Sequence, residues 1–326
     1  MRWGAAAALL AGLALTGWLV ASHGLSGILA LLHQAGWGIP LVVALHGVQL
    51  LASAEAWRAV AGPLRRRHGR VGFLALRWIR EGVNTMLPVA QIGGEVVGAR
   101  LLHRRGMPLP TAIAASAGDV GVGLLTQAVF TLVGLGVLAA LAGRSDTAFW
   151  FLAGTCGVLA VGAALGIGLR LGLAQPLERW VRRLSARLGW PGSGPGLDAA
   201  FRALGRDRAG LLRCGLLHVA SWVAGGAEVW LALHVLGAQA GYPESLAIEA
   251  LGQAIRTAGF AIPGAVGVAE GGLVLVCGLF GLPADLAIAL ALLKRLRDVA
   301  FGLPALVAWQ VLEARPAPAP AERTPA

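Results

Sequence analysis

Six stretches of this chain are apolar for long enough to cross a lipid bilayer as an α-helix. The hydrocarbon core is about 30 Å thick, and a helix needs roughly 20 apolar residues to span it. These stretches cover residues 4–21, 37–60, 111–140, 148–170, 213–237 and 286–312. Because 57% of the 326 residues are hydrophobic and only 13% are charged, a soluble fold could not bury the apolar surface. The sequence therefore predicts an all-α polytopic membrane protein with about six full spans.

Two further apolar stretches, residues 82–99 and 248–280, are interrupted by glycine and proline. In lipid, a backbone group without a hydrogen-bond partner costs several kcal/mol, so such a break survives only inside protein or beside a wet cavity. We expect two broken or re-entrant helical segments there, whose freed amides can bind a polar headgroup. The alternative is a packing kink in which the glycines allow close helix contact. The candidate residues at the breaks are Asn84, Pro88, Gln91, Gly93, Gly94, Pro263, Gly264 and Gly267.

A short pattern occurs once in each half of the chain. In both copies a Glu-x-Trp sequence precedes the break, a glutamate follows the proline at the same offset, and an Asp-Val sequence lies further on. The first copy has Glu55, Trp57, Pro88, Glu95 and Asp119, and the second has Glu228, Trp230, Pro263, Glu270 and Asp298. A repeat that carries charged residues into apolar surroundings is typical of a membrane transporter.

The arginines are unevenly distributed between the apolar stretches. Residues 61–80, 100–105 and 170–213 are rich in arginine, whereas residues 22–36 and 238–247 contain neither arginine nor lysine. Cytoplasmic loops of membrane proteins are enriched in these two residues. The distribution predicts that both termini are cytoplasmic and that the two copies of the pattern have opposite orientations in the bilayer. The chain would then be an inverted-topology internal repeat.

The pattern divides the chain into five parts. We expect an N-terminal span with an outer loop, a first repeat, a connecting span with a basic cytoplasmic segment, a second repeat and a disordered tail. Their ranges are 1–35, 36–140, 141–212, 213–312 and 313–326, in that order. Residues 1–21 are either an uncleaved first span or a cleaved signal peptide.

Glu95 and Glu270 follow the two breaks and are the main candidates for function. A carboxylate at membrane depth is costly unless it is paired or hydrated, so such a residue is a functional candidate by default. Each glutamate could accept hydrogen bonds from a polyol or amine headgroup, or carry a coupling proton. The alternative is that each caps the half-helix that follows it, because a carboxylate is favourable at a helix N-terminus.

Other charged residues in the apolar stretches are candidates for gating, ion pairing or substrate binding. They are Asp119, Asp298, Lys294, Arg297, Arg100 and Arg256. Lys294 precedes Asp298 by about one helical turn, so an ion pair between them is expected. Arg256 precedes the second break and is expected to balance the charge of Glu270 or of a lipid phosphate. A purely structural role in salt bridges is the alternative.

Glu55 and Glu228 are weaker candidates. Each lies two residues before a tryptophan, so we expect them near the membrane interface, with the tryptophan as the anchor. His46 and Gln49 lie on the same predicted helix as Glu55 and would extend its polar face.

Sequence signatures of common catalytic and metal sites are absent, since the chain has no HExxH, GxSxG, P-loop or CxxC motif. We therefore expect no cofactor, no metal site, and a transporter rather than an enzyme. The net charge of +11 comes from arginines between the apolar stretches, so nucleic-acid binding is not expected.

The two broken segments resemble a known superfamily. The stretch Asn84–Leu102, with its Leu-Pro-Val-Ala-Gln-Ile-Gly-Gly-Glu core, and the stretch Ile262–Glu270 are similar to the flippase-like superfamily built on the transmembrane domain of lysylphosphatidylglycerol synthases. Within it, the first stretch is most similar to the hopanoid-biosynthesis-associated membrane proteins. The resemblance covers residues 36–312 and implies movement of lipids between leaflets or towards the outer membrane. Because residue 326 ends the chain without the soluble aminoacyl-transfer domain of the synthases, synthase activity is not expected.

The sequence therefore predicts a lipid translocase of the bacterial inner membrane, with a hopanoid as the cargo suggested by the resemblance. The broken segments would meet near the midplane, with Glu95 and Glu270 in contact with the headgroup. The expected partners are the lipid, the membrane and lipid-biosynthesis enzymes. Two alternatives stay open: a non-catalytic scaffold that recruits lipid-modifying enzymes through its basic segment, and an intramembrane lipid transferase.

Overall fold

The structure is a computed structural model that describes residues 25–62, 69–87, 92–141, 156, 196–259, 262 and 265–314. Several predictions fall outside these residues and are not addressed by it. They are the spans at 4–21 and 148–170, the break residues Pro88, Gln91, Pro263 and Gly264, most of the basic connecting segment, and nearly all of the tail.

The described residues form ten α-helices and no strand. In the first half these are α2 (Leu25–Ala35), α3 (Gly38–Ala59), α4 (Arg70–Met86), α5 (Gly93–Arg104) and α6 (Leu109–Leu141). In the second half they are α9 (Leu197–Arg206), α10 (Arg208–Val235), α11 (Tyr242–Ala258), α12 (Val268–Leu279) and α13 (Ala284–Ala314).

Three of the described helices, α3, α6 and α10, are long and apolar enough to cross a membrane. They account for the predicted spans at 37–60, 111–140 and 213–237. The predicted span at 286–312 lies in α13, which has 31 residues but carries a group of charged side chains in its middle. The chain is a helical polytopic membrane protein, as the sequence predicts.

Both predicted breaks are present. The first separates α4 from α5, and the second separates α11 from α12. In each half the two helices of this hairpin have 17 and 12 residues. The hairpin follows a long helix (α3 or α10) and precedes another (α6 or α13), so the two halves repeat the same order of helices.

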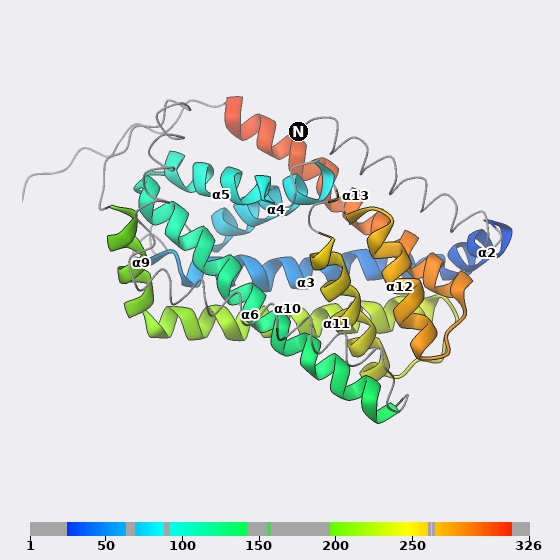
Figure 1. Ribbon diagram of the computed structural model, residues 1–326. Helices are drawn as coiled ribbons and strands as arrows, with labels where there is room; N and C mark the ends of the chain where they lie inside the picture. Colours follow the sequence, from blue (N-terminus) through cyan, green and yellow to red (C-terminus); the bar gives the residue numbers. More distant parts are fainter. Residues whose placement is uncertain are drawn as a thin grey trace, which may run out of the picture.

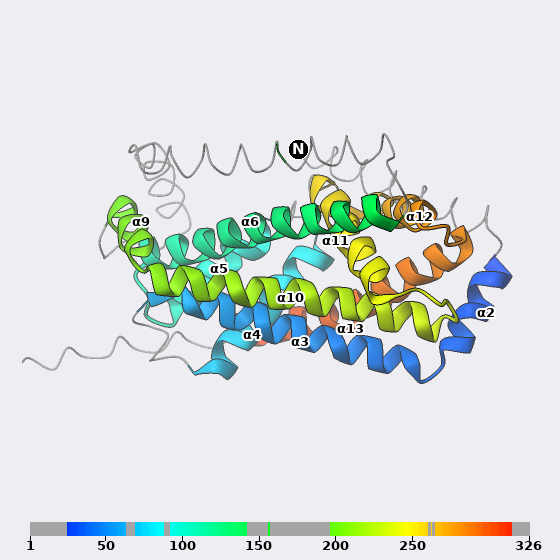
Figure 2. The same ribbon diagram turned by 90° about the horizontal axis from the view of Figure 1, so that it is seen from below.

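The two hairpins lie towards opposite ends of the molecule. In both views α4 and α5 lie towards the end that carries α9, whereas α11 and α12 lie towards the end that carries α2 (Figures 1 and 2). The halves also exchange contacts, because α4 packs against α13 and α11 packs against α6, while α3 packs along α10. Each half is therefore completed by the other.

Small residues allow these exchanged contacts. A β-carbon on Gly82 of α4 would lie 2.5 Å from the β-carbon of Ala305 on α13. A β-carbon on Gly134 of α6 would lie 2.7 Å from the β-carbon of Ala250 on α11. Close approach of this kind is how helices associate in lipid, where apolar burial alone gives little driving force.

The prediction that residues 61–80 are a cytoplasmic loop is wrong for the part that the structure describes. Helix α4 begins at Arg70, and Arg77 and Arg80 lie within it. Arg80 is only 4% exposed and is paired with carboxylates inside the protein. These two arginines therefore give no information on which loops are cytoplasmic, and the orientation of the termini stays a prediction.

Candidate functional site

A cavity of about 520 Å³ lies between the two halves. Its lining comes from α3, α4, α6, α10, α11, α13 and the N-terminal end of α5. The charged residues that line it are Arg77, Arg80, Arg256, Arg297, Glu81, Glu95, Asp119 and Asp298. A volume of this size is in the range of ligand-binding sites. Ionisable residues inside a membrane protein usually face such a cavity and mark a transport pathway.

Asp119 is the centre of the ion pairs in the first half. It is 1% exposed, and its Oδ2 accepts hydrogen bonds from Arg77 at 2.9 Å and from Arg80 at 2.7 Å. Its Oδ1 lies 2.9 Å from Nε2 of His218 on α10. Arg80 also reaches Oε2 of Glu95 at 2.6 Å. One arginine thus ties α4 to both α5 and α6.

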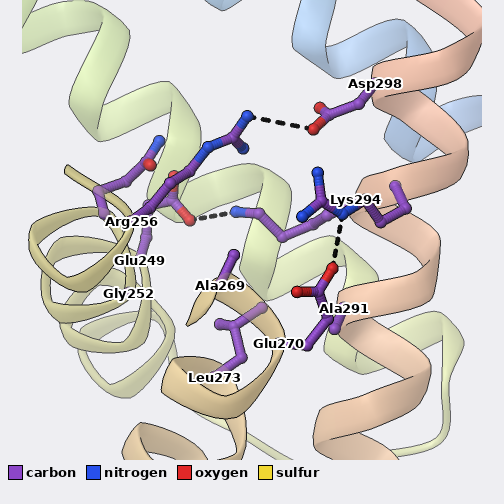
Figure 3. A pocket seen from close by; sticks show the side chains of 11 residues that line it. Glu249, Gly252, Arg256, Ala269, Glu270, Leu273, Ala291, Lys294 and Asp298 are labelled. Atoms are coloured by element: carbon purple, nitrogen blue, oxygen red, sulfur yellow. Dashed lines mark hydrogen bonds and ion pairs between the residues drawn. The ribbon is translucent and has the colours of Figure 1, made fainter. Parts of the chain in front are cut away.

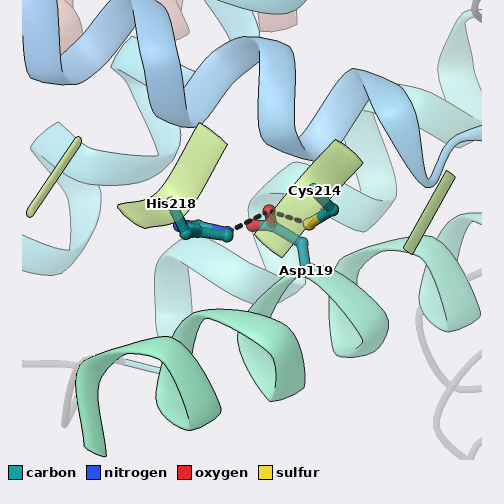
Figure 4. A group of neighbouring side chains, drawn as sticks. All are labelled: Asp119, Cys214 and His218. Carbon is teal, nitrogen blue, oxygen red and sulfur yellow. Dashed lines mark hydrogen bonds and ion pairs between the residues drawn. The ribbon is translucent and has the colours of Figure 1, made fainter. Parts of the chain in front are cut away.

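Asp119, Cys214 and His218 form a buried group whose ligand atoms lie within 4.8 Å of one another (Figure 4). A carboxylate, a thiolate and an imidazole are a donor set that zinc accepts. However, two guanidinium groups already bind the same carboxylate, and they would repel a further cation. We therefore interpret the group as a hydrogen-bonded support for Asp119.

Arg297 is the centre of the ion pairs in the second half. It binds Glu228 on α10, and its Nη2 lies 2.5 Å from Oδ1 of Asp298. Asp298 also accepts a hydrogen bond from Arg256 on α11 at 3.3 Å. Gln49 on α3 donates to the other oxygen of Glu228. These contacts join α3, α10, α11 and α13 around one side of the cavity.

The two halves contain corresponding ion pairs. In each half an arginine on the first helix of the hairpin binds the aspartate of the repeated pattern, which gives the pairs Arg80–Asp119 and Arg256–Asp298. They differ in strength, because the Arg80 side chain is 4% exposed and that of Arg256 is 22% exposed. Arg80 is not among the residues predicted for the site, because its arginine-rich surroundings resemble a loop. A signal was present, since both arginines precede the proline of their break by a similar number of residues.

Glu95 and Asn84 together hold the start of α5. Oδ1 of Asn84 accepts a hydrogen bond from the backbone N–H of Gly94 at 2.7 Å, and Nδ2 donates to Glu95 at 3.3 Å. Asn84, rather than Glu95, therefore satisfies a free amide at this helix N-terminus, which begins at Gly93. Glu95 lines the large cavity, and its contact with a cargo stays a prediction.

Glu270 has a different environment from Glu95. Its Oε2 accepts a hydrogen bond from the backbone N–H of Gly267 at 2.6 Å, so it caps α12, and its Oε1 pairs with Arg295 at 2.6 Å. It lines a smaller neighbouring cavity of about 30 Å³, which has room for about one water molecule and shares Gln253, Arg256 and Asp298 with the large cavity (Figure 3). The alternative role as a helix cap is therefore confirmed for Glu270. Glu95 and Glu270 do not line the same cavity in the described part of the chain.

The predicted partners of Arg256 and Lys294 are wrong. Arg256 pairs with Asp298 rather than Glu270, and Lys294 pairs with Glu249 at 2.5 Å rather than with Asp298 (Figure 3). Spacing along one helix allowed the Lys294–Asp298 pair. Helix α12 packs against both α11 and α13, and this packing brings the buried Glu249 close to Lys294. Asp298 pairs with the two arginines Arg256 and Arg297 instead.

Three further expectations have different outcomes. Arg100 does not line the described cavity but forms an ion pair with Glu313 near the end of α13 at 2.9 Å, which is the ion-pair alternative for this residue. Glu228 is 1% exposed and Trp57 is fully buried, so the expectations that this glutamate meets solvent and that this tryptophan anchors the protein in the interface are wrong. Glu55 lies among Arg58, Arg70 and Arg213, and the side chains of Arg70 and Arg213 are 76% and 52% exposed, so its place near the membrane interface stays a prediction.

Replacement of Gly94 by alanine is expected to destabilise the protein by about 1–3 kcal/mol. The added β-carbon would overlap the carbonyl oxygen of Arg80 and lie 2.6 Å from Oδ1 of Asn84, so α5 would have to move away from α4. Gly271→Ala is the matched control, because no atom lies within 4 Å of its added β-carbon. Thermal unfolding in detergent should show a lower transition temperature for Gly94→Ala only. Equal transitions for both variants would contradict the close packing of this hairpin.

A family model described as Lysylphosphatidylglycerol synthase TM region matches residues 5–305, which includes all of the described helices from α2 to α12 and most of α13. A search of curated proteins gave no significant match.

Proposed function

Because this chain belongs to the family of the lysylphosphatidylglycerol synthase transmembrane region, and is thus a lipid-related membrane protein, we propose that it is a flippase-like lipid translocase. The proposal places it in the bacterial inner membrane with both termini in the cytoplasm. The observation that carries it is the cavity of about 520 Å³, because a charged cavity of this size between two repeated halves can accept a lipid headgroup.

The lining of the cavity supports a particular class of headgroup. Among the described residues it has four arginines and four carboxylates, so its formal charge is balanced when the histidines are neutral. Such a lining favours a headgroup that is neutral overall and rich in hydrogen-bonding groups, rather than a strongly anionic one. A hopanoid with a polyol headgroup fits this description, and we take it as the cargo, moved between leaflets or towards the outer membrane.

Several residues are suited to hold this headgroup. Glu95 and Asn84 present acceptors and donors at the α5 end of the cavity, and Arg256 lies on the opposite hairpin. These three side chains are less constrained than the buried Asp119 and Arg297, which hold helices together. Movement of one half against the other would expose the headgroup to each side in turn.

Replacement of Glu95 by glutamine is expected to reduce the rate of lipid translocation about ten-fold or more, equivalent to at least 1.4 kcal/mol. The variant keeps the shape of the side chain but loses the charge that faces the cavity. The measurement uses purified protein in vesicles that contain a fluorescently labelled polyol hopanoid, and follows quenching of the label from outside. Parallel vesicles with labelled phosphatidylethanolamine or phosphatidylglycerol test the class of headgroup.

Glu313→Gln is the matched control, since it makes the same chemical change outside the cavity. It is expected to translocate lipid at close to the wild-type rate. The absence of translocation of all three lipids by wild-type protein would overturn the proposal. Faster movement of phosphatidylglycerol than of the polyol hopanoid would overturn the proposed cargo.

A further inference from the structure

A histidine lies between two carboxylates at the wall of the large cavity. Nε2 of His46 on α3 is 2.8 Å from Oε1 of Glu81 on α4, and Nδ1 is 3.3 Å from Oε2 of Glu228 on α10. His46 is 7% exposed and Glu228 is 1% exposed, whereas the side chain of Glu81 is 33% exposed and lines the cavity. The three side chains therefore run from the cavity into the buried ion pairs of the second half.

The hydrogen-bonding capacity of His46 does not match its surroundings when the ring is neutral. A neutral imidazole has one N–H, so one of its nitrogens can only accept. Carboxylates also only accept, yet a carboxylate oxygen lies near each nitrogen. Nδ1 is buried and has no hydrogen-bond partner among the described residues. One more proton, on the ring or on a carboxylate, would remove this mismatch.

The charges around His46 also require one additional proton. They come from four helices and are Glu81 on α4, Glu228 on α10, Arg256 on α11, and Arg297 and Asp298 on α13. Three carboxylates and two guanidinium groups leave one negative charge unbalanced. The neighbouring cations are already balanced, because Lys294 is paired with Glu249, and the two arginines Arg77 and Arg80 are paired with the two carboxylates of Asp119 and Glu95. A single proton makes this cluster neutral, and net charge inside a membrane protein is costly.

We propose that Glu81, His46 and Glu228 form a proton-binding relay that couples the movement of lipid to the movement of a proton. This inference rests on the proposed function, since it supplies the driving force for the same cavity. Chains of acidic and histidine side chains carry protons in this way in membrane pumps and transporters.

The relay can be written as a balanced set of proton transfers. A proton from cavity water binds the carboxylate of Glu81, which then passes a proton to Nε2 of His46. The ring releases its Nδ1 proton to Oε2 of Glu228, and no other bond is formed or broken. A neutral Glu228 no longer attracts Arg297 as an ion, so the contact between α10 and α13 weakens. Return of the proton to the cavity, after access has changed sides, restores this ion pair.

The test is lipid accumulation driven by a pH gradient. Wild-type protein is reconstituted in vesicles with the fastest of the three labelled lipids, and the membrane potential is clamped at zero with potassium and valinomycin. At one proton per lipid, a gradient of one pH unit is expected to shift the ratio of label between the leaflets about ten-fold. In His46→Gln the ratio should stay near one. An unchanged ratio in wild-type protein that still equilibrates the lipid would overturn the relay but not the translocase.

The matched control is His234→Gln, which removes an exposed histidine on α10 that bonds only to its own helix in the described contacts. It should accumulate lipid as the wild-type protein does. If His46→Gln also accumulates lipid under the gradient, the relay is wrong.

A second measurement does not depend on transport. Infrared difference spectra between pH 8 and pH 5 in lipid nanodiscs report which carboxylic groups and histidine rings gain a proton. Wild-type protein should gain a protonated carboxyl signal that is reduced in both His46→Gln and Glu81→Gln, two variants whose side chains need no buried counter-charge. Spectra of these variants that match the wild-type spectrum would overturn the relay even if no lipid crosses the membrane.

Discussion

Replacement of Arg297 by leucine is expected to lower the free energy of unfolding by about 3–5 kcal/mol, the largest effect among the single substitutions considered. Arg297 is the shared partner of Glu228 and Asp298, and all three side chains are buried. Loss of the guanidinium leaves two carboxylates in a low-dielectric environment. Asp298 retains Arg256, at 3.3 Å, whereas within the described residues Glu228 keeps a hydrogen bond from the neutral amide of Gln49. Denaturant titration of the purified protein in mixed micelles measures the difference.

Two further variants separate the burial of charge from a general effect of mutating an arginine. In the double variant Arg297→Gln and Glu228→Gln, the unpaired charge on Glu228 is absent, so stability should recover by more than half of the loss. Arg202→Gln removes an arginine that is paired with Asp198 in an exposed position on α9. A pair of that kind contributes about 0–1 kcal/mol, so this control should unfold like the wild-type protein. A double variant as unstable as Arg297→Leu would contradict the explanation.

Replacement of Arg80 by glutamine is expected to cost about 3 kcal/mol, whereas the corresponding change of Arg256 in the second half should cost about 1 kcal/mol. Arg80 is buried, binds Asp119 at 2.7 Å and Glu95 at 2.6 Å, and lies 4.9 Å above the ring of Trp57. Arg256 has a more exposed side chain, and within the described residues its one ion pair is with Asp298 at 3.3 Å. The two residues occupy corresponding positions of the repeat, so each serves as the control for the other.

The same pair of variants can be compared by translocation rate. Arg80→Gln removes the charge that fixes Glu95 in the cavity, so its rate should fall together with its stability. Arg80→Lys should not restore either quantity, because a lysine cannot bridge two carboxylates with the geometry of a guanidinium group. Equal losses for Arg80→Gln and Arg256→Gln would show that the two halves carry their ion pairs with equal strength, contrary to the exposures and distances.

Much of the architecture could be predicted from the sequence because the lipid bilayer restricts which backbone structures can form. Long apolar stretches predicted α3, α6, α10 and the length of α13. In lipid every backbone hydrogen bond must be made within the protein, and a single chain segment can do this only as a helix. Glycine and proline in residues 82–99 and 248–280 predicted the two breaks for the same reason. Helix α4 was missed because its charged face resembles a loop when it is judged by hydropathy, although its arginines have partners inside the protein.

The candidate site was predicted only in part. The repeated pattern identified Glu95, Asp119 and Asp298, which line the cavity, but also Glu270, which caps α12 instead. It did not identify Arg77, Arg80, Glu81 or His218 as members of the site. These residues matter because helices from both halves of the chain bring them together, and no spacing within one helix contains that information.

The amino-acid sequence by itself determined the helical membrane class, the places where helices break and the residues that repeat, because these depend on backbone hydrogen bonding and on burial of apolar surface. The tertiary structure alone decided which charges are paired. Lys294 binds Glu249 and not Asp298, and Arg80 binds Asp119 and Glu95, because an ion pair forms with whichever opposite charge the packing of helices brings within a few ångströms.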